Sequence, residues 1–342
     1  CCVVDNSLLN GRHNIVQCCF ALSSFLKFVC KDNYNGNIFT TIKGKNTFFG
    51  CFYSIIIVTL QMNFRKMEQK DIFNSIRNVT EKLKTADVNI PSICEKTIDR
   101  AEIKESVKLF RSVVFANYFG AVDISTSLSR LYTLLSRQID FIGNIFSMEL
   151  PGTGQQLAQN FIDEIPNLRS VLGTDVKAVF DGDPAAVSHE EVILCYPTIV
   201  AMVHYRMAHA LHRLGVPILP RIITELAHSL TGIDIHPGAQ IGEYFCIDHG
   251  TGVVIGETCI IGNHVQLYQG VTLGAKSFKF DENGNPINLP RHPIIEDNVI
   301  VYSNTSILGR IRIGHDTIVG GNVWLTEDLP PYSKYFQSKG ER

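Results

Sequence analysis

Apolar residues recur at helical spacing from residue 67 to about residue 230 and at a six-residue spacing after it, which predicts an α+β protein. We expect an N-terminal all-helical domain followed by a left-handed parallel β-helix built of hexapeptide repeats. The chain has 342 residues, of which 45% are hydrophobic, enough for two domains with cores of their own. Its net charge of -2 argues against a nucleic-acid-binding protein, which usually carries a basic excess.

Residues 1–66 are interpreted as an upstream or non-native extension. The first methionines are Met62 and Met67, and the segment before them has neither helical nor strand periodicity. Its apolar run over 48–60 is shorter than the roughly 20 residues of a membrane span, and it lacks a signal-peptide cleavage site. We favour translation from one of these methionines over a membrane anchor, and we expect residues 1–61 to be dispensable.

The cysteines predict a reduced, cytoplasmic protein. Six of the ten lie in the first 51 residues, and the other four are scattered without CxxC spacing. Such a distribution fits ordinary core residues better than a disulfide framework. The four are Cys94, Cys195, Cys246 and Cys259.

The helical domain is predicted over residues 67–232. Its first helix starts at Met67, and further amphipathic stretches cover 102–118, 124–146, 155–164 and 197–230. Pro151-Gly152 and the Asp-Gly-Asp-Pro stretch over 181–184 separate them. Three histidines in the last stretch (His204, His209 and His212) fall on different faces or beside core residues. We therefore interpret them as structural rather than as metal ligands.

The second domain is predicted over residues 233–328, with a C-terminal tail over 329–342. Its small or branched apolar residues are spaced six apart in two blocks: 235, 241, 247, 253, 259, 265, 271, and then 295, 301, 307, 313, 319, 325. This period is typical of hexapeptide solenoids, in which three hexads make one triangular turn of 18 residues. Between the blocks, residues 275–292 form an extruded loop, and the gap of 24 residues from Val271 to Ile295 predicts an unchanged phase.

Titratable residues stand at two places in this solenoid. Asp248 and His249 directly follow the inward Ile247, so a corner can display them outward beside the bare backbone of Gly250 and Gly252. Arg291 and His292 stand where the extruded loop rejoins the repeats, and an arginine fork suits a substrate carboxylate.

Several stretches closely resemble the serine acetyltransferases of the hexapeptide-repeat acyltransferase superfamily. They are DIHPGAQIG, DHGTGVVIGET, QGVTLGAKSF and RHPIIEDNV, and FDGDPAAVSHEEVILCYP…YRMAHAL resembles the family's helical domain. The likeness covers roughly residues 67–328. It implies an acetyl-CoA-dependent transferase that acetylates the hydroxyl of L-serine to give O-acetyl-L-serine and CoA, the first step of cysteine biosynthesis, without a metal ion.

The resemblance also assigns roles to residues. His249 matches the family's general base, and Asp234 matches the carboxylate that orients it; the two are 15 residues apart, nearly one coil. The substrate-binding positions are matched by Asp183 and Asp248 for the serine ammonium, Arg291 for the carboxylate, and His292 beside it. The positions along which CoA lies are matched by Gly274, Ala275 and Lys276.

The partners implied are L-serine, acetyl-CoA and further copies of the chain, as a homotrimer or a pair of trimers. Ala275 and a longer loop stand where the family commonly has a glycine pair and a short loop. The chain ends Gly-Glu-Arg, whereas many members end in an isoleucine that docks into cysteine synthase, so that partnership is not predicted.

Three alternatives remain open from the sequence. The first is a hexapeptide acyltransferase acting on another hydroxyl acceptor, such as homoserine or a sugar. The second is a metal hydratase of the carbonic-anhydrase type, which would need a pair of histidines five positions apart that the solenoid lacks. The third is a catalytically inactive scaffold, which the full set of polar site residues disfavours.

Overall fold

The computed structural model describes residues 69, 71–82, 98–121, 123–277, 279–285, 287 and 289–337. The chain divides into two compact units, residues 1–92 and 93–342. In the first unit residues 71–82 are helical, as predicted, and the apolar Ile72, Ile76 and Val79 are exposed. The predicted extension over 1–66 lies outside the described residues. No helix in the described part is long and apolar enough to span a membrane.

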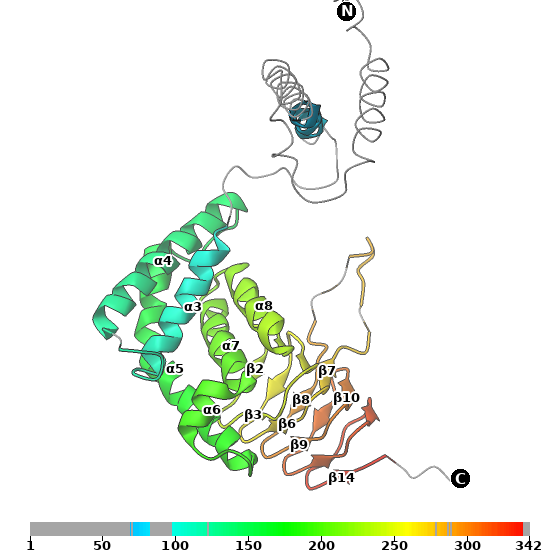
Figure 1. The fold of residues 1–342 in the computed structure, drawn as a ribbon. Coiled ribbons are helices and arrows are strands. Elements are labelled where there is room, and N and C mark those ends of the chain that lie inside the picture. Colours follow the sequence, from blue (N-terminus) through cyan, green and yellow to red (C-terminus); the bar gives the residue numbers. More distant parts are fainter. Residues whose placement is uncertain are drawn as a thin grey trace, which may run out of the picture. The chain divides into compact units, whose positions relative to one another are not determined.

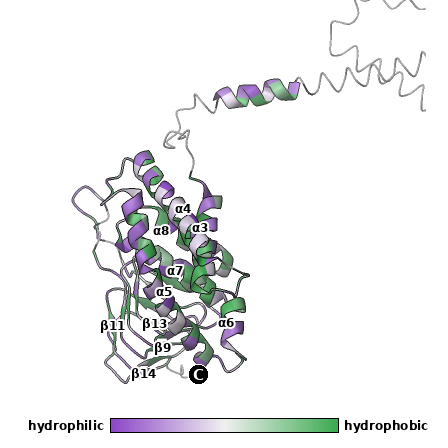
Figure 2. Ribbon diagram, turned by 90° about the vertical axis from the view of Figure 1, so that its left-hand side faces the viewer, coloured by the Kyte–Doolittle hydropathy of each residue, from purple (hydrophilic) through white to green (hydrophobic). Residues whose placement is uncertain are grey.

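The described part of the second unit begins with six helices (Figure 1). They are α3 (Arg100–Val114), α4 (Ile124–Ile145), α5 (Gly154–Gly182), α6 (His189–Cys195), α7 (Pro197–Arg213) and α8 (Leu219–Thr231). Side chains of Asp99, Asp123, Thr153 and Ser188 accept hydrogen bonds from backbone N–H groups of the first turns of α3 to α6, which explains where these helices begin. Helix α7 is buried along most of its length, and apolar stretches gather on it in Figure 2.

Two helix predictions were wrong in extent. Helix α5 runs far beyond the predicted 155–164 and contains Pro166 in its interior. The predicted stretch 197–230 is two helices, because Gly215 (φ 76°) and Ile218 (φ 59°) adopt left-handed backbone conformations between α7 and α8. The short helix α6 was not predicted.

In the described residues fourteen short strands follow, and all of their pairings are parallel. The chain visits three sheets in turn, which we call the first (β1-β4-β7-β10-β13), second (β2-β5-β8-β11) and third (β3-β6-β9-β12-β14) sheets. The strands are β1 (Asp234–Ile235), β2 (Gln240–Ile241), β3 (Cys246–Ile247), β4 (Val254–Ile255), β5 (Ile260–Ile261), β6 (Gln266–Leu267), β7 (Thr272–Gly274), β8 (Ile294–Ile295), β9 (Ile300–Val301), β10 (Ser306–Leu308), β11 (Arg312–Ile313), β12 (Ile318–Val319), β13 (Trp324–Leu325) and β14 (Lys334–Tyr335).

The predicted six-residue register is interrupted at the turn that carries Asp248 and His249. Asp234 pairs with Val254, twenty residues later, whereas Val254 pairs with Thr272, eighteen residues later. The turn after β3 therefore holds two residues more than the prediction allowed. The apolar spacing did not reveal these two extra residues, because two positions of each repeat are buried, here Val253 and Ile255, and either could fit the six-residue pattern.

The extruded loop also changes the phase, contrary to the prediction. Ile260 pairs with Ile294, thirty-four residues later, whereas Ile294 pairs with Arg312 after the usual eighteen. The loop thus adds sixteen residues, which is no multiple of six. The strand residue before the loop is Leu273, not Val271, and both are fully buried.

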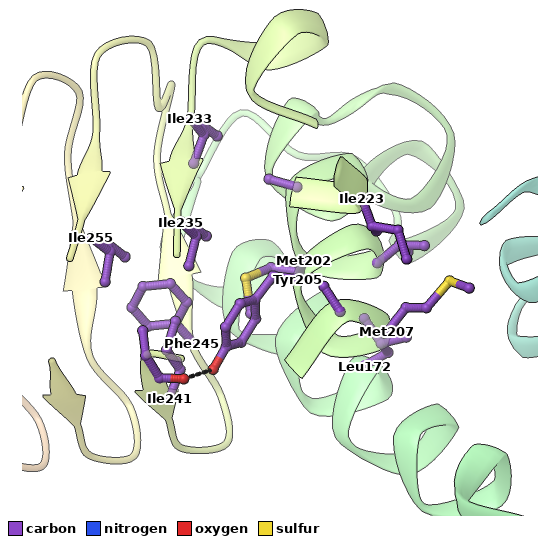
Figure 3. Close-up of a cluster of buried hydrophobic side chains, with 14 of the residues drawn as sticks. Leu172, Met202, Tyr205, Met207, Ile223, Ile233, Ile235, Ile241, Phe245 and Ile255 are labelled. Carbon is purple, nitrogen blue, oxygen red and sulfur yellow. Dashed lines mark hydrogen bonds between the residues drawn. The ribbon is translucent and has the colours of Figure 1, made fainter. Parts of the chain in front are cut away.

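The helices pack on the first turn of strands through an apolar cluster (Figure 3). Tyr205 of α7 reaches the strands, where Ile235, Ile241 and Phe245 surround it and its hydroxyl donates a hydrogen bond of 2.6 Å to the carbonyl oxygen of Ala239. This contact fixes the helices against the strands that carry the candidate site.

A buried ion pair joins the same two parts. The guanidinium of Arg206 donates to both carboxylate oxygens of Asp175 at 3.1 and 3.0 Å and to the carbonyl oxygens of Ile241 and Gly242 at 2.6 Å each. Asp175 also accepts from the backbone N–H of Phe245 at 3.2 Å. Both charged groups of this buried pair therefore have hydrogen-bond partners, which offset the cost of removing the charges from water.

Candidate functional site

The enlarged turn after β3 displays the acid–histidine pair. His249 has a left-handed backbone (φ 58°) and a side chain that is 70% exposed, whereas the side chain of Asp248 is 18% exposed. His249 Nδ1 lies 3.8 Å from Asp248 Oδ1. Gly250 (φ 88°) lets the turn pack tightly, because a Cβ there would lie 2.5 Å from Cδ1 of Ile233. The turn therefore presents an accessible imidazole on a fixed backbone.

The end of helix α5 brings a second carboxylate to this turn. A Cβ on Gly182 would lie 3.4 Å from Sγ of Cys246 in β3, so the helix end packs directly on the strand. Asp183, the next residue, accepts a hydrogen bond of 2.5 Å from the hydroxyl of Tyr196 and one of 2.8 Å from the backbone N–H of Ala185. These bonds lower the pKa of Asp183, and His249 contributes a smaller attraction in the same direction.

The pKa of Tyr196, the partner of Asp183, shifts in the opposite direction. The hydrogen bond to Asp183 raises the pKa of Tyr196 to about 12, with Asp248 among the smaller contributors. Asp248 and His249 thus lie close enough to Asp183 and Tyr196 to affect the pKa values of the latter two. We call this group, where the chain passes from the third sheet to the first, the His249 edge.

Arg291 and His292 lie at a different edge, where the chain passes from the first sheet to the second. Arg291 Nη2 donates to Glu257 Oε2 at 2.6 Å, and the backbone N–H groups of Arg291 and His292 donate to Oγ1 of Thr258 at 2.9 and 3.1 Å. The turn after β4 thus anchors the base of the extruded loop. We call this group the His292 edge.

His292 is buried, with 7% of its surface exposed. Burial and the adjacent charge of Arg291 lower the pKa of His292 to about 4, so that its imidazole is neutral at neutral pH. Its ring lies over Gly256, where a Cβ would come within 2.2 Å of Nε2. Glycine at this position is therefore needed for the ring to occupy its place.

A groove of about 310 Å³ adjoins the His292 edge. Its lining includes Lys276, Arg291 and Arg310 together with the apolar Ile287 and Leu289. Gly274 is the last residue of β7 and accepts a backbone hydrogen bond of 2.9 Å from Gly309, which also lines the groove. Of the three positions expected to meet CoA, Lys276 lines this basic groove.

Asp234 is not paired with His249 in the single chain. Its Oδ1 lies 3.4 Å from Nη1 of Arg221, and Arg221 also forms an ion pair of 2.5 Å with Glu225. Among the described residues, Glu225, His228 and Asp234 are the one group close enough to hold a metal ion. The cationic Arg221 already forms ion pairs with both carboxylates of this group, those of Glu225 and Asp234.

The histidines of helix α7 make contacts of the structural kind that the sequence predicted. His204 Nδ1 and His209 Nδ1 lie 2.7 and 2.8 Å from the carbonyl oxygens of Val200 and Pro237. His212 packs edge-on against the ring of His236. Of the described cysteines, Cys246 and Cys259 are buried as expected, but Cys195 is exposed.

The single chain therefore assembles the predicted residues in two groups. Asp183, Asp248 and His249 meet at the His249 edge, whereas Arg291, His292 and the segment 274–276 meet at the other. The first sheet separates the two edges, and no hydrogen bond or ion pair between described residues joins them.

Comparison with known proteins identifies the family. The plasmid serine acetyltransferase of Synechococcus elongatus is 44% identical to the chain over 249 residues, which are 67% of this chain and 78% of that protein. The chain belongs to the serine acetyltransferase family. The serine acetyltransferase of Bacillus subtilis is also 44% identical, over 163 residues that cover 48% of this chain and 71% of that protein. No protein-family model matches the chain.

Solved serine acetyltransferase structures share the fold. Isoform 3 from Entamoeba histolytica, in complex with cysteine, is 32% identical with a TM-score of 0.61 and covers 78% of this chain and 91% of its own. Serine acetyltransferase 1 from the same organism, in complex with L-cysteine, is 35% identical with a TM-score of 0.60, covering 67% and 85%. The helical region followed by parallel sheets is thus the architecture of this family.

Sequence reasoning overlooked four residues that contact the candidate site residues of this serine acetyltransferase. They are Tyr196, Glu257, Thr258 and Arg310. Glu257 and Thr258 stand in the quoted GET stretch, directly after the glycine of a repeat, and their polar side chains at a corner were an available signal. Nothing in the sequence indicated that Tyr196 or Arg310 would reach the site.

Proposed function

We propose that this chain transfers the acetyl group of acetyl-CoA to the hydroxyl of L-serine, giving O-acetyl-L-serine and CoA, with no metal ion involved. Membership of the serine acetyltransferase family supports the reaction. The observation that carries the assignment to particular residues is the enlarged turn at the His249 edge, which exposes one imidazole beside two carboxylates.

In this proposal His249 is the general base. A serine hydroxyl is a weak nucleophile at neutral pH, and a neutral imidazole within hydrogen-bonding distance can accept its proton as the oxygen attacks the thioester carbon. The acetyl group then forms an ester with the serine oxygen, and the thiolate of CoA leaves. Asp234, which contacts Arg221 in the single chain, is assigned to orient His249 in the assembled enzyme.

We assign the remaining substrate-binding residues by charge complementarity. Asp183, whose lowered pKa keeps it anionic, and Asp248 bind the serine ammonium, whereas Arg291 binds its carboxylate with His292 beside it. CoA lies along residues 274–276, where Lys276 and Arg310 supply positive charge for its phosphates. Cationic side chains bordering a partly apolar groove suit a ligand that joins phosphates to a pantetheine arm.

We further propose that the working enzyme is a homotrimer. Ammonium-binding and carboxylate-binding groups lie on different edges of one chain, while a single L-serine must touch both. A neighbouring copy that places its His292 edge against this His249 edge would complete the site. We interpret the three parallel sheets as a left-handed β-helix, preceded by a helical domain that ends at Gly232.

Mixed oligomers test the shared site. His249→Ala and Arg291→Ala each alter one edge and are expected to be nearly inactive alone. Refolding or coexpressing the two together should restore activity, because some interfaces then combine two intact edges. Failure of mixing to restore activity in oligomers that contain both variants would contradict the shared site.

The function itself is tested by thiol release from acetyl-CoA with a panel of acceptors. We expect L-serine to give the highest kcat/KM, above homoserine and sugar hydroxyls. Faster turnover with a sugar would overturn the substrate assignment, and absence of thiol release with every acceptor would overturn the reaction.

A further inference from the structure

The hydrogen bonds around His292 determine which of its ring nitrogens carries a proton. The backbone N–H of Thr258 points at Nδ1 of His292 over 3.1 Å. A backbone N–H can only donate, so Nδ1 must offer a lone pair. The hydroxyl of Thr258 also lies 2.9 Å from Nδ1. Because this oxygen already accepts two backbone N–H groups, its own hydrogen is available to Nδ1.

The surrounding packing holds this arrangement in place. Nη1 of Arg310 donates to the carbonyl oxygens of Thr258 and His292 at 2.6 and 3.0 Å and so ties the two chain segments together. Gly256 leaves room for the ring, since a Cβ there would lie 2.0 Å from Cδ2 of His292. The imidazole therefore has little freedom to rotate and exchange its two nitrogens.

The charges that face the ring oppose a second proton. Arg291 and Arg310 disfavour the imidazolium, as does His236, whereas Glu257 favours it; burial disfavours it most. Since Glu257 is itself engaged by Arg291 at 2.6 Å, the one nearby anion is largely neutralised. A neutral ring with a bare Nδ1 carries its single hydrogen on Nε2.

We propose that Thr258 is a positioning residue that fixes His292 as the neutral Nε2–H tautomer, so that His292 serves the active site as a hydrogen-bond donor and never as a base. The inference rests on the proposed function, in which His292 contacts the amino-acid substrate beside Arg291. Nε2–H then donates to an oxygen of that substrate. The two histidines of the site thereby have opposite duties, since His249 accepts a proton and His292 only donates a hydrogen bond.

Nitrogen NMR on the full chain with labelled histidine tests the tautomer without reference to activity. We expect His292 to show a bare Nδ1 and a protonated Nε2 at neutral pH. The chain contains controls: His204 and His209 face carbonyl oxygens through Nδ1 and must carry hydrogen there, whereas His236 Nδ1 accepts from the N–H of Gly238 at 3.0 Å. A protonated Nδ1 on His292, in either the neutral or the charged ring, would overturn the proposal.

Two amide substitutions test the donor role. The amide nitrogen of glutamine reaches the region of Nε2, whereas the shorter asparagine reaches only that of Nδ1. We expect His292→Gln to keep kcat/KM for L-serine within about tenfold of the wild type and His292→Asn to lose about a hundredfold, the range of one hydrogen bond to a charged group. Asparagine matching or exceeding glutamine would contradict a donor at Nε2.

The role of Thr258 is tested by Thr258→Val against Thr258→Ser. Valine keeps the shape and the backbone N–H that donates to Nδ1, but it removes the hydroxyl that also donates to Nδ1 and that holds the Arg291 and His292 backbones. We therefore expect part of the protein to adopt the Nδ1–H tautomer and the KM for L-serine to rise about tenfold. Serine should restore both. A single Nε2–H tautomer with a normal KM in Thr258→Val would refute the positioning role. If the wild type proved inactive on L-serine, the NMR result would still decide the tautomer.

Discussion

The hydroxyl of Tyr196 donates a 2.5 Å hydrogen bond to Oδ2 of Asp183, and this pair joins the start of helix α7 to the end of helix α5. The bond holds the carboxylate in its ionised form and at a fixed orientation beside the turn that carries His249. A residue of the helical region thus completes a site built mainly on strands.

Removing this hydroxyl should weaken amino-acid binding selectively. In Tyr196→Phe the pKa of Asp183 is expected to rise toward its ordinary value and its side chain to gain freedom. We expect the KM for L-serine to rise by about 3- to 30-fold, with the KM for acetyl-CoA unchanged. Initial rates with each substrate varied measure this. Equal effects on both KM values would show a general disturbance instead.

Replacing the proposed base should affect the chemical step. We expect His249→Ala to lower kcat by roughly 10²- to 10⁴-fold, the usual contribution of a positioned acid–base group, with little change in acetyl-CoA binding. His264→Ala is a matched control, because His264 also occupies a turn with a left-handed backbone (φ 57°) but stacks on Tyr244. Near-normal turnover in His249→Ala would refute the mechanism.

Substituting Asp234 distinguishes two roles for its carboxylate. If it orients His249 in the assembled enzyme, Asp234→Asn should lower kcat, though less than His249→Ala does. Arg221→Gln removes the partner that Asp234 has in the single chain and should leave kcat within about twofold. A larger loss in Arg221→Gln than in Asp234→Asn would assign the carboxylate a structural role.

The buried ion pair between Asp175 and Arg206 should dominate the attachment of the helices to the strands. We expect Asp175→Ala to lower the free energy of unfolding by about 3–5 kcal/mol, because it leaves a buried guanidinium without its counter-ion. Glu105→Gln removes the exposed ion pair with Arg130 and should lower the free energy of unfolding much less, because solvent screens exposed charges. Urea unfolding of both variants compares them.

Stability should fall with acidity partly through His292. Its pKa is about 4 in the folded protein, against an ordinary value of 6.5, so between these values the unfolded chain binds more protons. The contribution is complete above about pH 6.5 and is lost as the pH falls toward about 4. His292→Gln should weaken this dependence by about 3 kcal/mol. Unfolding free energies that fall equally in both proteins would contradict it.

Comparing the variant with the wild type isolates this residue from others. Burial also lowers the pKa of His204, His209 and His236, so each adds to the wild-type slope in the same direction. These groups are unchanged in His292→Gln. The difference between the two curves therefore reports His292 alone.

The sequence by itself determined that a helical region is followed by a solenoid of short strands. A period of six is incompatible with a helix or a single long strand, so the repeat predicted a solenoid, and the polar pair after Ile247 predicted a displayed corner. It also supplied the candidate site residues, through their resemblance to one family. These features depend on local spacing, which the sequence records directly.

The tertiary structure alone decided the register and the partners. Both Val253 and Ile255 are buried, so apolar spacing could not reveal the two extra residues beside His249, which only the pairing of Asp234 with Val254 shows. Likewise, Tyr196 and Asp183 are thirteen residues apart and come together because α5 and α7 pack on one another. Thr258 and His292 meet across the extruded loop, since stacking of successive coils, rather than proximity in the chain, brings their backbones together.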